Sequence, residues 1–146
     1  MVTDDELLYR CVFCEPQSNY VINEQGLRVS SQAFADRSKR PSVDRAKLCN
    51  YDPKWTQKST SDGVVSLIAG EVRLIDINKT DTQGNILSAY RIDVCPRPVD
   101  DNPSHAQIEA SPDYESGSRF KKVLEKLAFL ANQKIKKDGW EIEPLH

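Results

Sequence analysis

His105 is the internal histidine of this sequence, and its imidazole is the group best suited to acid–base chemistry. It lies in N-P-S-H-A, near the end of residues 90–108, Y-R-I-D-V-C-P-R-P-V-D-D-N-P-S-H-A-Q-I. Asp100, Asp101 and Asp113 are carboxylates that could orient the ring. The spacing pairs no nucleophile with it. The alternative is a histidine that only hydrogen-bonds its own loop.

A second candidate group combines arginine with serine. Ser42 to Arg45 (S-V-D-R), together with Ser30 and Ser31, could hold an anionic ligand such as a nucleotide phosphate, because a guanidinium matches phosphate geometry. A structural Asp–Arg pair that fixes the loop is an equally good interpretation. The sequence contains no Gly-rich phosphate-binding loop.

The cysteines are the candidates for metal binding. Cys11 and Cys14 form a CxxC pair, and Cys49, Cys95 and His105 could complete a zinc site. However, the pair lies in a strand-like run, where residues three apart point to opposite faces, and no second CxxC pair follows. We therefore expect no metal ligands and interpret the cysteines as free thiols that pack as small apolar side chains.

Residues 28–58 are basic and contain the aromatic side chains Tyr51 and Trp55. Phosphate contacts combined with stacking aromatics are typical of surfaces that bind single-stranded nucleic acid. The pI of about 5.7 argues against strong non-specific binding. Nucleic acid is therefore a disfavoured partner, although the sequence does not exclude it. The alternative is that this segment is only a solvated charged surface.

Length and composition indicate one globular domain over residues 1–146. The chain is 38% hydrophobic and 29% charged, with a net charge of −2, which excludes wholesale disorder. No run of 18 apolar residues is present to span a bilayer. The start M-V-T-D-D-E-L-L lacks the pattern of a signal peptide, so we expect a cytoplasmic protein with no membrane partner.

The clearest predicted element is a C-terminal amphipathic helix. Its N-terminus has Ser116 or Ser118 as a capping residue, and Gly139 follows its C-terminus. Apolar residues recur at helical spacing along one face: Phe120, Val123, Leu124, Leu127, Ala128, Ala131 and Ile135. We expect this helix to be structural.

Several segments favour strands. Residues 7–13, 20–22 and 106–110 are strand-like, and residues 140–142 are expected to pack back as a short strand or tail. Residues 27–34 fit either a strand or a short helix. The charged segment 36–45 is expected to be a basic loop.

The most apolar segment, residues 64–77, is ambiguous before Gly70. After it, Val72 to Ile77 suggest a strand with a bulge. Residues 86–94 alternate well enough to return antiparallel to that strand. The combined prediction is an α+β fold, in which an antiparallel sheet carries the C-terminal helix on one face.

Four stretches, S-S-Q-A-F (30–34), S-V-D-R-A (42–46), G-V-V-S-L-I-A-G-E-V-R (63–73) and N-P-S-H-A (102–106), resemble a group of small bacterial proteins of unassigned function. The resemblance covers residues 8–142 and implies that the four stretches meet at one site. The opening L-Y-R with the later serines also resembles ADP-ribosyltransferase-like domains. That likeness implies a dinucleotide held by Arg10 with Ser30 and Ser31, although the catalytic glutamate of such domains has no identifiable counterpart.

Three functional hypotheses follow. The first is a bacterial binding or interaction protein with a polar site around His105, whose partner is a protein or a nucleotide-like anion. The second is a small enzyme acting on a nucleotide or nucleic acid, with Arg10, Ser31, Arg45 and His105 in one pocket and His105 as acid or base. The third is a zinc-stabilised module. The sequence does not identify a cofactor.

Overall fold

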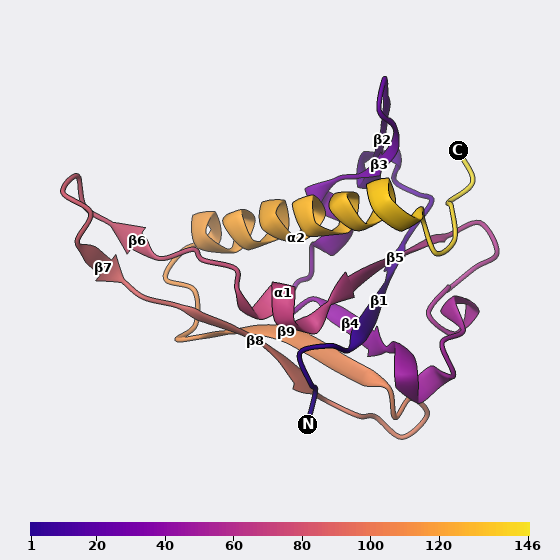
Figure 1. Cartoon of the computed structure of the whole chain (residues 1–146), viewed down its shortest axis with the longest axis horizontal. Coiled ribbons are helices and arrows are strands. Elements are labelled where there is room, and N and C mark those ends of the chain that lie inside the picture. The colour runs from indigo at the N-terminus through magenta and orange to yellow at the C-terminus, as the bar shows by residue number, and fades with distance from the viewer.

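The computed structural model describes all residues 1–146, and its centre is a five-stranded antiparallel sheet covered on one face by a long helix, α2 (Figure 1). The strand order is β5-β1-β4-β9-β8. This arrangement confirms the predicted α+β fold. The elements of this layer pair are β1 (Leu7–Val12), β4 (Ser42–Arg45), β5 (Gly63–Ile68), β8 (Arg91–Pro96), β9 (His105–Ser111) and α2 (Gly117–Asp138).

Helix α2 forms where the apolar spacing predicted it, and the predicted face lies in the core against the sheet. Gly139 ends the helix with a φ of 83°, and its N–H donates to the Ile135 carbonyl. Such a positive φ favours glycine. The predicted cap is only partly right, because Ser116 makes no capping bond to the backbone and its Oγ lies 2.8 Å from Ser118 Oγ.

A small hairpin packs beside one end of α2 (Figure 1). It consists of β2 (Tyr20–Asn23) and β3 (Gly26–Val29), after the 3₁₀ helix η1 (Gln17–Asn19). The 3₁₀ helix η2 (Ser31–Phe34) follows directly. The ambiguous segment 27–34 therefore contains both alternatives, a strand and then a short helix.

The prediction of a basic loop over residues 36–45 is wrong at its end, where β4 forms. This strand pairs with both β1 and β9, so it lies in the middle of the sheet. The sequence conceals it because Val43 is its one apolar residue and Asp44 and Arg45 are charged. Both charged residues are nevertheless buried, since side chains from distant segments hydrogen-bond them.

The predicted strand at residues 72–77 is also wrong. Strand β5 runs to Ile68 and a short helix, α1 (Ala69–Arg73), follows. Ala69, Val72 and Ile75 are buried, and their spacing of three fits a helical turn. Gly70 allows the turn to lie against residue 4, because a Cβ there would come within 2.9 Å of the Asp4 carbonyl oxygen.

The predicted pairing of residues 86–94 with residues 72–77 fails with that strand. Instead β6 (Lys79–Thr80) and β7 (Ile86–Ser88) form a separate arm that projects from the body (Figure 1). Strand β8 pairs with β9 over six residue pairs. Residues 90–108 are thus a strand, a turn and a returning strand. The tail also packs back as expected, with Ile142 bridged to Val64.

The sheet has two chemically different faces, because side chains alternate along each strand. Leu8, Val43 and Ala106 point into the core under α2. Their neighbours Tyr9, Asp44 and His105 are aligned across three strands on the opposite face. The 3₁₀ helices η3 (Ala46–Cys49) and η4 (Pro53–Trp55) lie in the connection from β4 to β5. None of the helices has the length and apolar character needed to cross a bilayer.

Candidate functional site

The candidate site is a pocket of about 330 Å³ between β1 and β4, which we call the β1–β4 pocket. The two strands pair at only two positions, Leu8–Arg45 and Tyr9–Asp44, and β1 then continues without β4 beside it. The volume is at the lower end of the range for small-molecule sites. The lining residues are Tyr9, Arg10, Cys11, Phe13, Ala35, Asp36, Ser42, Val43, Asp44, Thr56, Lys58, Asn102 and His105.

Arg10 is held in the pocket wall by backbone carbonyls. Its Nε donates to Ala33 O at 3.1 Å, Nη1 to Ser42 O at 2.8 Å and Nη2 to Ala35 O at 3.3 Å. The guanidinium carbon lies 5.9 Å from the ring centre of Phe34. Burial lowers the pKa of Arg10 from its usual value, but an arginine stays charged in a protein. The site therefore contains a fixed positive charge.

His105 is held through both ring nitrogens. Nδ1 lies 2.7 Å from the Arg97 carbonyl oxygen, and Nε2 lies 3.2 Å from Ser42 Oγ. The prediction that Asp100, Asp101 or Asp113 orients the ring is wrong, since the Arg97 carbonyl does so. The structure also pairs His105 with a hydroxyl, Ser42, that sequence spacing did not reveal.

Asp44 fastens the turn before His105 to the centre of the sheet. This carboxylate is 5% exposed and accepts hydrogen bonds from Thr56 Oγ1 at 2.7 Å and Asn102 Nδ2 at 2.9 Å. Ser104 Oγ lies 3.2 Å from the same carboxylate. Because its oxygens are occupied, Asp44 supports the site and leaves ligand contacts to its neighbours.

The hypothesis of one pocket shared by Arg10, Ser31, Arg45 and His105 is wrong in part. Arg10 and His105 line the β1–β4 pocket, whereas Ser31 and Arg45 do not. Arg45 is on the opposite side of β4 from Asp44, where Nε donates to Glu6 Oε1 at 2.8 Å and Nη2 to Glu6 Oε2 at 3.0 Å. Ser31 begins η2, whose Ala33 carbonyl accepts the bond from Arg10.

The buried Glu6 carboxylate makes the stability depend on pH. Burial alone would raise the pKa of Glu6, but bonds from Arg45, Thr3 N–H and Lys47 lower it from 4.5 to about 2. This contribution, roughly 3 kcal/mol, is fully present above pH 4.5 and is lost as pH falls toward 2. Urea unfolding at pH 6 and pH 3 should show the loss. Between these pH values the free energy of unfolding of Glu6→Gln should fall by about 2 kcal/mol less than that of the wild type. An equal fall in both proteins would contradict the assignment of the pH dependence to Glu6.

The cysteines do not assemble into a metal site, since no three His, Cys, Asp or Glu side chains are grouped to hold an ion. All four are free thiols, and Cys11 and Cys49 are buried. Burial raises the pKa of both buried thiols to about 11. These thiols are therefore protonated near neutral pH and are poor nucleophiles.

The basic residues of segment 28–58 do not form one surface, because they lie in different parts of the structure. Lys47 lies 3.4 Å from Glu6, and Arg28 lines a different hollow. Lys58 is the lysine of this segment that lines the β1–β4 pocket. Trp55, which is 48% exposed, donates from Nε1 to Asn102 Oδ1 at 3.2 Å. The segment thus supplies one cation and a supporting aromatic residue to the pocket.

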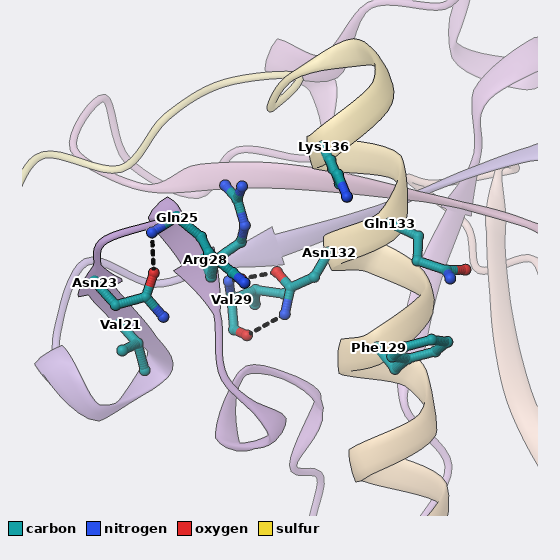
Figure 2. Close-up of a pocket in the computed structure, with 9 residues that line it drawn as sticks. All are labelled: Val21, Asn23, Gln25, Arg28, Val29, Phe129, Asn132, Gln133 and Lys136. Carbon is teal, nitrogen blue, oxygen red and sulfur yellow. Dashed lines mark hydrogen bonds between the residues drawn. The ribbon is translucent and has the colours of Figure 1, made fainter.

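A larger hollow of about 700 Å³ lies between the β2–β3 hairpin and α2 (Figure 2). There the Asn132 side-chain amide accepts from Val29 N–H and donates to the Val29 carbonyl, both at 2.9 Å. Figure 2 shows Asn132 reaching the hairpin from the helix and Phe129 projecting from the helix. This hollow is open and is lined by no histidine or carboxylate, so the β1–β4 pocket is the better candidate.

No family model, curated protein or solved structure matches the chain. Within the fold, two of the four stretches singled out in the sequence meet directly, since residues 42–46 and 102–106 join through Ser42 and His105. Residues 30–34 reach the same place through the Ala33 carbonyl. Residues 63–73 form β5 and α1 and line no part of the pocket.

Proposed function

We propose that the protein binds a small anionic ligand of the nucleotide class in the β1–β4 pocket. The observation that carries this proposal is that two cations of the pocket, Arg10 and Lys58, form no ion pair. Both line the pocket, and neither takes part in an ion pair. The three carbonyl bonds to Arg10 leave two of its five N–H groups for a ligand. A phosphate would satisfy these donors.

The remainder of the pocket suits the other parts of a nucleotide. Phe13 is 45% exposed at the pocket wall and offers a ring on which a base can stack. Asp36 lines the same pocket, and only its Oδ1 is occupied, by Ser38. Its other oxygen is an acceptor for a sugar hydroxyl. The combination of cation, aromatic ring and acceptor favours a nucleotide over a bare anion.

The test is calorimetric titration with AMP, adenosine and inorganic phosphate. AMP should bind more tightly than either fragment, with an affinity that falls as salt rises. Lys58→Ala should weaken AMP binding about 3- to 10-fold, and Arg10→Lys more, because lysine keeps the charge but loses the guanidinium fork. Lys54→Ala is the matched control, since Lys54 is exposed and outside the pocket. Equal affinity for adenosine and AMP, or no effect of Lys58→Ala, would overturn the proposal.

A further inference from the structure

We infer that Ser42 is a nucleophile activated by His105, and that the β1–β4 pocket cleaves a phosphate ester. The choice of a phosphate ester rests on the function proposed above, whereas the activation of Ser42 rests on separate geometry. Ser42 and His105 lie 63 residues apart in the sequence, but β4 and β9 place them on the same face of the sheet.

The hydrogen bonds of His105 fix the position of its proton. The Arg97 carbonyl oxygen can only accept, so the nitrogen 2.7 Å away, Nδ1, must carry the hydrogen. In the neutral ring, Nε2 then has a free lone pair. Ser42 Oγ, at 3.2 Å, therefore donates its hydrogen to Nε2. This is the tautomer that a general base needs to activate a hydroxyl.

The backbone of Ser42 is held from two sides, by its partner strand and by Arg10. Ser42 is paired with Gln107 of β9, and its carbonyl accepts the bond from Arg10 Nη1 at 2.8 Å. The same bond holds the guanidinium against the Ser42 backbone, where it lines the pocket. Arg10 can thus stabilise the negative charge that develops on the oxygens of a reacting phosphate.

The reaction has two balanced halves. Ser42 Oγ forms a bond to phosphorus while its proton moves to His105 Nε2. The bond from phosphorus to the leaving oxygen breaks, and that oxygen takes the proton from Nε2. A water molecule then attacks the phosphoserine, giving one proton to Nε2. The Ser42 oxygen leaves with the P–O electrons and recovers the proton, so ester and water become alcohol and phosphate.

The test uses a fluorophosphonate probe, whose fluoride leaves when an activated serine attacks phosphorus. Wild-type protein should take up one probe at Ser42, located by peptide mass spectrometry, and Ser42→Ala should take up none. His105→Asn should react at least about 100-fold more slowly, since asparagine can donate to the Arg97 carbonyl but cannot accept the proton. Ser118→Ala, at an exposed serine, is the matched control and should react as the wild type does.

A second readout is hydrolysis of bis(p-nitrophenyl) phosphate, which should require Ser42, compared with neutral p-nitrophenyl acetate. Absence of labelling at Ser42 in folded wild-type protein, or equally fast labelling in His105→Asn, would contradict the inference that His105 activates Ser42 as a nucleophile. If Ser42 is labelled but the protein hydrolyses the acetate faster than the phosphate, the assignment of a phosphate ester as substrate is wrong, whereas Ser42 remains the nucleophile. If AMP does not bind but Ser42 is still labelled, the proposed nucleotide binding is wrong and the activation of Ser42 stands. Circular dichroism and thermal melting establish that each variant is folded.

Discussion

Replacing Arg45 by alanine should lower the free energy of unfolding by about 3 to 5 kcal/mol. Glu6 is 5% exposed, and in the variant its carboxylate loses both bonds from Arg45. Lys47, at 3.4 Å, replaces little of this interaction because its side chain is 40% exposed. The loss is larger than for a surface ion pair because a buried carboxylate that keeps only the Thr3 N–H and Lys47 has lost its main compensating charge.

Urea unfolding at neutral pH measures this effect. Arg97→Ala is the control, because Arg97 pairs with Glu109 but its side chain is 51% exposed, so it should cost less than about 1 kcal/mol. The double variant Glu6→Leu with Arg45→Met should recover most of the stability, since it removes both charges. AMP affinity should be unchanged in Arg45→Lys. Equal costs for Arg45→Ala and Arg97→Ala, or a large loss of AMP affinity in Arg45→Lys, would contradict a structural role for Arg45.

Replacing Phe34 by alanine should lower the free energy of unfolding by about 4 kcal/mol and also weaken ligand binding. Phe34 is fully buried in the main core, where η2 packs against α2. Its ring also lies 5.9 Å from the Arg10 guanidinium carbon, and the neighbouring carbonyls of Ala33 and Ala35 hold that group. The cavity therefore affects the pocket wall as well as the core.

Phe34→Leu separates the two consequences. It keeps most of the apolar volume, so we expect a loss of less than about 1.5 kcal/mol. It removes the aromatic face under Arg10, and AMP affinity should fall only a few-fold because the carbonyl bonds remain. Thermal or urea unfolding and calorimetry at a temperature where both variants are folded measure the two effects. If Phe34→Leu were as unstable as Phe34→Ala, the cavity would not be the cause.

The sequence predicts those elements in which the buried residues recur at the regular spacing of a helix or a strand. Helix α2 places Leu127 and Ala131 in the core at the spacing of one helix face, and its prediction is confirmed. Strand β1 is predicted equally well, because all its residues except Arg10 are apolar or aromatic. The segment after Gly70 misleads, since Val72 and Ile75 fit either a bulged strand or a helical turn, and the close approach of residue 4 is a tertiary contact.

The candidate site is harder to predict because its contacts are not local. His105 is recognisable by its type and Arg10 only through the resemblance to ADP-ribosyltransferase-like domains, and both line the pocket. The pairing of Ser42 with His105 depends on β4, a strand whose two charged residues concealed it. Arg45 was singled out for the right chemistry, charge-assisted bonding to an anion, but that anion is the protein's own Glu6.

The strand order also determines when the pocket forms during folding. Helix α2 and the β8–β9 hairpin need only local contacts, which form quickly. In contrast, β1 must find β4 and β5, with partners such as Arg45 for Leu8 and Val64 for Cys11 far along the chain. We expect the closure of β1 onto these strands to be a late event, so that partly folded chains have helix and hairpin but no pocket. A ligand would then bind only the complete fold, and at 100 times its dissociation constant it would add about 2.7 kcal/mol to the stability of the whole chain.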